Sequence, residues 1–180
     1  SPPFFKNPKI TSRGKKVTVE FPKEEPLRED ATYTINFGES IVDFTEGNPA
    51  EGFRFVFATG DKIDSLTFEG TLEDALDQKP VKDILVLLYD VLEDSVVVLD
   101  KPFYYARTDA EGKFKFENLK NDTFKLLVLE DLNFNYLLDE EVERLAFPDS
   151  FYVLRDSVVY NPVLRLFKPK SRVRILNSSS

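Results

Sequence analysis

The sequence predicts an all-β protein made of two consecutive β-sandwich units, and three observations predict it. Apolar and polar residues alternate over several short runs, which is the pattern of strands with one buried face. Of the 180 residues, 17 are Phe, a residue that favours sheets over helices. Turn-forming Gly, Pro, Asn and Asp residues separate the runs at short intervals, as they do in β-sandwiches.

The first unit spans residues 1–62 and is predicted to contain about four strands. Every second residue is apolar in residues 17–21, 33–37 and 53–57. Strands with a single apolar face need a second sheet to cover that face. Because the sequence starts at Ser1 without an initiator Met, we expect a preceding segment to supply the covering sheet.

The second unit spans residues 63–154, and a basic C-terminal part spans residues 155–180. Runs of β-forming residues predict about seven strands in the second unit. Short helical turns are expected only at residues 72–76 and 139–145. The β-forming runs are residues 66–68, 84–89, 96–99, 103–106, 114–116 and 124–129.

A tight turn is predicted at residues 109–112, between two of these runs. The sequence Asp-Ala-Glu-Gly places Gly112 where a hairpin turn needs a positive φ angle. The next strand would then point Phe114 and Phe116 into the core, and Lys113 and Lys115 into solvent.

Composition excludes several classes of catalytic site. The chain has no Cys and no His, so disulfides, thiolate nucleophiles, Ser-His-Asp triads and zinc-His sites are impossible. No nucleophile elbow, P-loop or dinucleotide-binding glycine motif is present. Paired carboxylates are frequent, but adjacency in loops is typical of a solvated acidic surface. We therefore expect a protein without enzymatic activity.

Charge is distributed unevenly along the chain. The net charge is −8, but residues 61–150 carry 10 basic and 22 acidic side chains, whereas residues 151–180 carry six and one. Nucleic-acid binding is not expected, because phosphates require a basic face. No run of 18 apolar residues is present, so no membrane-spanning helix is predicted.

One segment resembles half of a calcium-binding loop. Oxygen-bearing side chains occupy its first, third, fifth and ninth positions, and a backbone carbonyl is available at the seventh. Tyr136 stands where an EF-hand has Gly, and Val142 where it has a bidentate Glu, with Glu141 one place away. The alternative is an Asx-rich turn whose side chains bind backbone groups. The candidate metal ligands are Asp131, Asn133, Asn135, Leu137 and Asp139.

Two further groups of residues are candidates for partner binding. Phe134 and Tyr136 flank Asn135 in the same polar segment, where exposed aromatic rings would anchor a protein or stack on a sugar. In the basic C-terminal part, strands are predicted at residues 163–167 and 172–176. These are either edge strands protected by charge or a docking surface for an acidic partner. Their candidate residues are Arg165, Arg172 and Arg174.

Two stretches resemble known domain families. Residues 32–38 and 55–61 resemble the final strands of a bacterial Ig-like domain. Residues 108–119 and 122–128 resemble the carboxypeptidase-regulatory-like module, a prealbumin-like β-sandwich. The order of the two resembles a group of Bacteroidetes cell-surface lipoproteins.

This resemblance implies an extracytoplasmic protein at the outer membrane or cell surface of a Gram-negative bacterium. We expect a non-catalytic structural or protein-interaction module, a subunit or scaffold of a lipoprotein assembly. Its partner would be an envelope protein such as an outer-membrane β-barrel, and it would meet the membrane only through an anchor outside this segment. The alternative is a calcium-assisted carbohydrate-binding module. Apart from calcium as a candidate, no cofactor is expected. A third hypothesis is an enzyme, such as an accessory domain of a glycosidase or peptidase.

Overall fold

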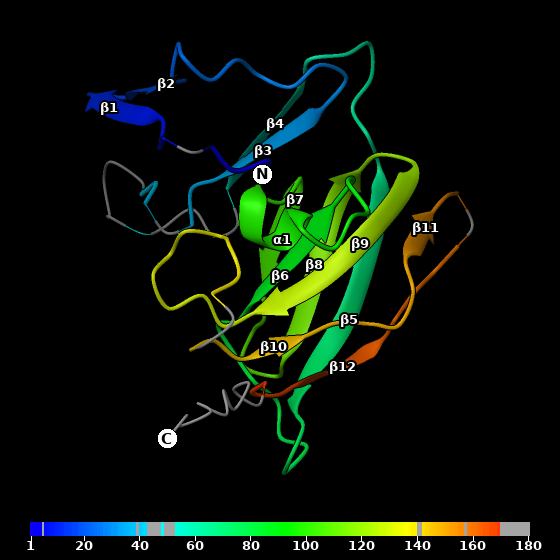
Figure 1. Ribbon diagram of the computed structural model, residues 1–180. Helices are drawn as coiled ribbons and strands as arrows, with labels where there is room; N and C mark the ends of the chain where they lie inside the picture. Colours follow the sequence, from blue (N-terminus) through cyan, green and yellow to red (C-terminus); the bar gives the residue numbers. More distant parts are fainter. Residues whose placement is uncertain are drawn as a thin grey trace, which may run out of the picture.

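The computed structural model describes residues 1–4, 6–38, 40–42, 48, 53–139, 142–156 and 158–169 (Figure 1). These residues form two larger sheets and two two-stranded sheets, so the predicted all-β class is confirmed. In this described part, no helix has the length and apolar character needed to cross a bilayer.

The two larger sheets are built from the chain after residue 65. In the first sheet, all pairs are antiparallel, and β10 and β11 share the outer edge of β9. Its strands are β10 (Leu145–Ala146), β9 (Asp122–Leu129), β6 (Leu85–Tyr89), β7 (Tyr104–Arg107) and β11 (Tyr152–Leu154). In the second sheet, β5 lies in the middle, antiparallel to β8 and parallel to β12. Its strands are β12 (Val163–Leu166), β5 (Leu66–Asp74) and β8 (Lys113–Leu119).

The inner faces of these two sheets share one hydrophobic core, the main core. Phe68, Phe114 and Phe116 enter it from one sheet, and Phe124 and Leu126 from the other. Along β8, Phe114 and Phe116 are buried whereas Lys113 and Lys115 are exposed, as the alternation predicts. Each such aromatic side chain contributes about 2–3 kcal/mol by leaving water, which is what holds the sheets together.

A second core covers the outer face of the first sheet. Leu85, Leu87 and Tyr89 of β6 point into it, and the helix α1 (Val96–Leu99) packs there through Val96 and Val97. The predicted strand at residues 96–99 is therefore wrong. Both edges of β6 are occupied by β7 and β9, so this segment buries its Val side chains as one helical turn on the sheet's face.

Two other local predictions need correction. The expected helical turn at residues 72–76 is wrong at its start, because β5 continues to Asp74. The expected helical turn at residues 139–145 lies partly outside the described residues, and Leu145 belongs to β10. The tight turn before β8 is present, and Gly112 has a φ of +71°. However, β7 and β8 belong to different sheets, so the turn connects two layers and does not form a β-hairpin.

The first 60 residues contribute two small sheets at one end of this body (Figure 1). The hairpin of β1 (Lys9–Arg13) and β2 (Lys16–Glu20) projects outward. The other sheet pairs β3 (Thr32–Asn36) with β4 (Arg54–Ala58), and its Tyr33 is buried in the main core. This second small sheet is thus attached to the body, whereas the hairpin is largely exposed.

The turn before β8 gives a stability prediction with a matched control. Gly112 and Gly14 both have positive φ, but a Cβ at Gly112 would lie 2.5 Å from the carbonyl oxygen of Leu72, whereas Gly14 is surrounded by open space. We expect Gly112→Ala to lower the free energy of unfolding by about 3 kcal/mol, and Gly14→Ala by about 1 kcal/mol or less. Urea denaturation followed by circular dichroism measures both free energies of unfolding. Equal losses in the two variants would contradict the close packing of the Gly112 turn against β5.

Candidate functional site

The predicted calcium loop, residues 131–143, is called the acidic loop here. It connects β9 to β10 and is closed at its base by Glu130 and Arg144. The N–H of Glu130 donates to the carbonyl oxygen of Arg144 at 2.9 Å, and the guanidinium of Arg144 donates twice to the Glu130 carboxylate, at 2.7 and 2.8 Å. Arg144 also reaches Asp74 of β5 at 3.0 Å. These bonds tie the ends of the loop to both sheets, and the Arg144 guanidinium lowers the pKa of the Glu130 carboxyl group.

Side chains of the acidic loop fold its backbone into a compact shape. The two carboxylate oxygens of Asp131 accept the N–H groups of Asn135 and Tyr136, at 3.2 and 2.9 Å. The side-chain oxygen of Asn135 accepts the N–H of Leu137 at 2.6 Å. Phe134 and Tyr136 have positive φ angles of 61° and 65°, a conformation that costs a non-glycine residue about 1–2 kcal/mol. The dense hydrogen bonding stabilises this conformation.

The predicted metal ligands lie together in this loop. The Asp139 carboxylate accepts the side-chain amide of Asn133 at 2.6 Å and that of Asn135 at 3.5 Å, and Asp131 binds the backbone of the same turn. In the part of the chain that the structure describes, no group of three or more Asp or Glu residues could hold a metal ion. Calcium binding therefore stays a prediction that depends on the Asn oxygens as well as the two carboxylates.

Glu143 is a loop residue that the sequence did not single out. Its side chain is completely buried, and its two carboxylate oxygens accept the N–H of Leu132 at 3.0 Å and that of Asp139 at 2.8 Å. Glu143 thereby joins the beginning and the end of the loop. It lies one position beyond the place where a calcium loop has its bidentate Glu, and no sequence signal separates it from Glu140 and Glu141.

The two aromatic residues of the loop have different environments. Phe134 is 73% exposed. Tyr136 packs against the second core, with its ring 5.2 Å from that of Tyr105 and 5.1 Å from the ammonium group of Lys101. Burial raises the pKa of Tyr136 to about 12. Phe134 is therefore the aromatic side chain that the loop exposes to solvent.

The predicted C-terminal binding residues lie elsewhere. Arg165 is exposed on β12, which forms an edge of the second sheet and places Arg165 opposite Glu73 of β5. Arg172 and Arg174 lie outside the described residues. Arg165 belongs to the second sheet and the acidic loop connects two strands of the first, and a β-bridge between Phe167 and Leu145 links the two sheets there.

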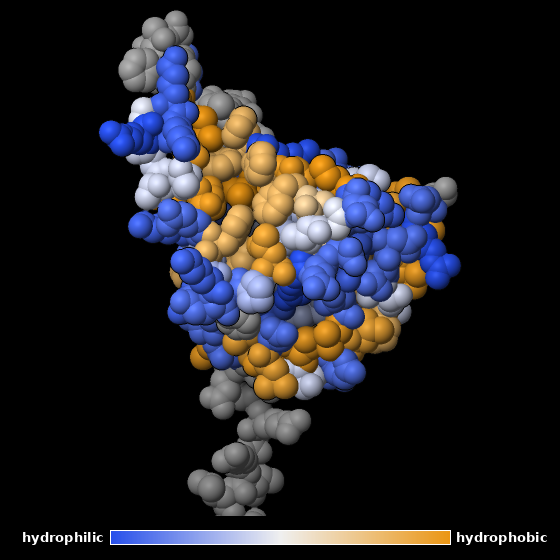
Figure 2. Space-filling view, turned by 90° about the horizontal axis from the view of Figure 1, so that it is seen from above, coloured by the Kyte–Doolittle hydropathy of each residue, from blue (hydrophilic) through white to orange (hydrophobic). Residues whose placement is uncertain are grey.

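The structure reveals a larger apolar surface on β3 and β4, which we call the aromatic face. Phe53 and Phe55 are 47% and 54% exposed there, and the ring of Phe37 lies 5.7 Å from that of Phe53. At the other end of this face, Phe57 stacks on buried Tyr33 at 5.3 Å. Figure 2, which looks onto this end of the molecule, shows apolar side chains in a continuous area beside hydrophilic ones. The aromatic face consists of Ile35, Phe37, Phe53, Phe55 and Phe57.

The aromatic face borders a free strand edge. Phe37 and Thr59 donate backbone hydrogen bonds across the β3–β4 ladder, to Phe53 and Ala31, so the odd-numbered residues of this part of β4 bond to β3. The backbone groups of Arg54, Val56 and Ala58 consequently point to the other side. Among the described residues, β4 pairs with no strand on that side. The corresponding edge of β3 is partly occupied, because Ser1 and Thr34 exchange two backbone hydrogen bonds.

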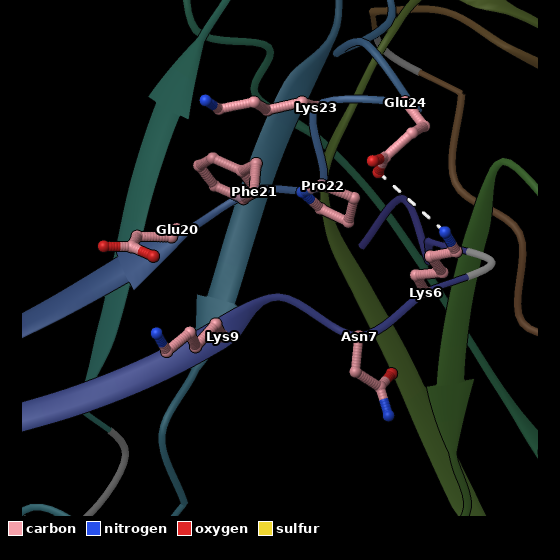
Figure 3. Close-up of a pocket in the computed structure, with 8 residues that line it drawn as sticks. All are labelled: Lys6, Asn7, Lys9, Glu20, Phe21, Pro22, Lys23 and Glu24. Atoms are coloured by element: carbon pink, nitrogen blue, oxygen red, sulfur yellow. Dashed lines mark ion pairs between the residues drawn. The ribbon is translucent and has the colours of Figure 1, made fainter.

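A shallow hollow lies at the base of the projecting hairpin (Figure 3). Phe21 and Pro22 lie between its charged side chains, of which Lys6 and Glu24 form an ion pair at 3.9 Å. The charged groups of Lys9 and Lys23 point away from that pair. The charged side chains drawn in Figure 3 do not converge on a reacting group.

Comparison of the chain with protein-family models, with curated proteins and with solved structures gave no match. The assignment of function therefore depends on the residues and geometry of this chain.

Glu143 is expected to be critical for the stability of the loop. Glu143→Ala leaves two N–H groups without their acceptor, at a cost of roughly 1–3 kcal/mol for each buried group. We expect the free energy of unfolding in urea to fall by about 3 kcal/mol. Glu111→Ala, which truncates an exposed Glu in another loop, is the control and should change it by less than about 0.5 kcal/mol. Equal losses of unfolding free energy in the two variants would show that the buried Glu143 carboxylate does not stabilise the folded state.

The Glu130–Arg144 pair predicts a pH dependence. Because Arg144 lowers the pKa of Glu130 in the folded state, the unfolded chain binds a proton more readily as the pH falls. The stability from this pair is present above the ordinary carboxyl pKa of 4.5 and is lost below it. We expect the native protein to lose more stability between pH 7 and pH 3.5 than Arg144→Gln, as measured by urea unfolding. Lys82→Gln, on an exposed ion pair, should leave the native pH profile unchanged.

Proposed function

We propose that this chain is a non-catalytic, extracytoplasmic structural and protein-interaction module. It would act as a subunit or scaffold of an outer-membrane or cell-surface lipoprotein assembly. The observation that carries the interaction role is the aromatic face beside the free edge of β4. Exposed Phe53 and Phe55 lie where backbone donors and acceptors of Arg54, Val56 and Ala58 are also available.

Exposed aromatic side chains beside a free strand edge favour association with another molecule, because contact removes their apolar surface from water. Adjacent Phe rings on a surface favour association, because each buries a large apolar area with little loss of side-chain entropy. A free edge adds backbone hydrogen bonds to any extended segment that lies beside it. The two features together favour a protein partner over a small molecule.

The β3–β4 sheet is attached to the body by specific contacts, which suits it to a scaffold. The hydroxyl group of Thr32 donates to Asp64 at 2.8 Å, and Asp64 donates its N–H back to Thr32 at 2.9 Å. Arg54 forms an ion pair with Glu117 of β8. With Tyr33 in the main core, these contacts hold the aromatic face in a constant orientation relative to the sandwich.

Further support for the proposal comes from the sequence resemblance and from the described residues, among which no acid–base pair converges. Where a carboxyl pKa is displaced, at Asp77, Asp94 and Glu130, a neighbouring cation lowers it, which is the opposite of what a general acid requires. The extracytoplasmic setting, the β-barrel partner and the division into an Ig-like and a prealbumin-like sandwich follow from the resemblance to Bacteroidetes lipoproteins.

Site-specific photo-crosslinking tests the interaction role. A benzophenone amino acid replaces Phe55 in the parent protein expressed at native level, and in a control it replaces almost fully exposed Leu76 in the β5–β6 connection. We expect a discrete adduct of constant mass at position 55 and none at position 76. Phe53→Ser with Phe55→Ser should abolish co-purification of the same partner in mild detergent, and Leu76→Ser should preserve it.

Two outcomes would contradict this proposal. Adducts of equal yield at positions 55 and 76 would mean that contact is random. A partner retained by the Phe53→Ser, Phe55→Ser variant would exclude the aromatic face as its binding surface.

The acidic loop favours a second candidate, a calcium-assisted carbohydrate-binding module. In the loop, side-chain oxygens of Asp131 and Asn133 both accept the N–H of Asn135, the Asp139 carboxylate accepts the side-chain amide of Asn133, and Phe134 is exposed to solvent. An exposed ring next to a divalent cation is a suitable platform for a sugar.

Thermal unfolding with calcium and with chelator tests this candidate. If calcium binds, it should raise the unfolding temperature by several degrees, since a ligand of the native state stabilises it. Asp139→Ala should remove the shift, whereas Asp83→Ala in another exposed loop should preserve it. No shift, together with no calcium-dependent signal on a glycan array, would eliminate the candidate.

A further inference from the structure

The β1–β2 hairpin has two chemically different faces. In its antiparallel register, Ile10 lies opposite Val19, and Ser12 opposite Val17, which places three aliphatic side chains on one face. The residues in between point to the other face. There Lys9 lies opposite Glu20, Thr11 opposite Thr18, and Arg13 opposite Lys16.

Among the described residues, the hairpin is mostly exposed, with only Thr18 and Val19 half-buried. All residues of β1 are exposed, and Ile10 is 61% exposed although it is a large aliphatic residue. Figure 1 shows the hairpin extending away from the two large sheets. An isolated two-stranded hairpin is only marginally stable in water, so a partner that covers it would stabilise it.

The end of the hairpin is strongly basic. Arg13 and Lys16 are directly opposite each other on either side of the turn at Gly14 and Lys15, and like charges in that position repel. From Lys9 to Lys16 the chain has no acidic residue. The middle of the chain is acidic, since residues 61–150 carry 22 Asp and Glu against 10 Lys and Arg. An anionic group at the turn would relieve the repulsion.

We propose that the β1–β2 hairpin is a docking arm for an acidic surface on a protein partner. The cations of Arg13, Lys15 and Lys16 would contact carboxylates on one wall of a groove in that partner, and Ile10 and Val17 an apolar strip on the opposite wall. This surface is additional to the aromatic face, and its biological use rests on the proposed interaction function. The acidic residues 61–150 would repel the same partner, so charge favours the hairpin over that part of the body.

A cleft or groove in a protein suits this hairpin better than a lipid bilayer does. The aliphatic side chains and Arg13 and Lys16 lie on opposite faces, and a flat surface contacts one face at a time. A protein groove encloses both. Long nucleic acids are disfavoured, because they would also meet the acidic body.

The test uses a synthetic probe and the whole chain. The probe is a fluorescein-labelled ten-residue peptide of alternating Glu and Val, and peptides of alternating Lys and Val or Glu and Ser are its controls. Fluorescence anisotropy should show binding of the Glu-Val peptide at 50 mM salt, weakened at least tenfold at 300 mM salt. The Lys-Val peptide should not bind, and the Glu-Ser peptide should bind several-fold more weakly.

Variants locate the binding surface. The triple variant Arg13→Ser, Lys15→Ser, Lys16→Ser should weaken binding at least tenfold. Its matched control removes three exposed lysines of the body, Lys79→Ser, Lys82→Ser and Lys113→Ser, and should retain native affinity. Ile10→Ser with Val17→Ser should weaken binding several-fold, which separates the apolar contribution from charge. Thermal unfolding of each variant confirms that the body is folded, since all these side chains are exposed.

Three results would overturn the inference. These are native affinity in the hairpin triple variant, an equal loss in the control variant, and binding to vesicles with 30% phosphatidylglycerol but not to the peptide, which would indicate a lipid surface. The crosslinking experiment at Phe55 is independent of these variants. An adduct at position 55 without peptide binding would reject the docking role of the hairpin and support the proposed function. Peptide binding without an adduct would support the hairpin's docking role and reject the interaction role of the aromatic face.

Discussion

The rest of the structure depends on the burial of β6 on both of its faces. All five residues of Leu85–Tyr89 are buried, and a strand of this kind must be covered twice. Val86 and Leu88 face the main core, which the second sheet completes, and Leu85 and Leu87 face the second core. The second cover is not a sheet. It consists of α1 and the acidic loop, so a requirement of hydrophobic burial decides where the loop lies.

The acidic loop is consequently held by apolar and polar contacts together. Leu138 packs on the second core and donates its N–H to the carbonyl oxygen of Val97, which joins the loop to α1. Buried Glu143 and the Glu130–Arg144 pair close the loop from its other side. This bonding maintains positive φ angles at Phe134 and Tyr136 that neither residue favours alone. The result is a hydrogen-bonded polar loop whose exposed ring is Phe134.

Three surfaces therefore surround one sandwich-like body: the aromatic face, the acidic loop and the basic hairpin. The aromatic face is fixed to the body through Tyr33 and Thr32, whereas every residue of β1 is exposed. This combination suits a module that orients partners. Attachment of the aromatic face to the body keeps a partner bound there in a constant orientation, and the opposite charges of the acidic loop and the basic hairpin direct different partners to each. Nothing comparable converges on a reacting group in the described part of the chain.

The sequence by itself determined the all-β class, most strands, the positive φ of Gly112 and the inward direction of Phe114 and Phe116. These depend on period-two alternation and on local backbone sterics, which act between near neighbours. The sequence did not reveal that Val96–Leu99 is helical, that the turn at Gly112 joins two sheets, or that Glu143 is buried. It also did not show that Phe53 and Phe55 remain exposed. Alternation identifies the residues that share a face, but only long-range strand pairing decides which faces are covered, and that pairing belongs to the tertiary structure.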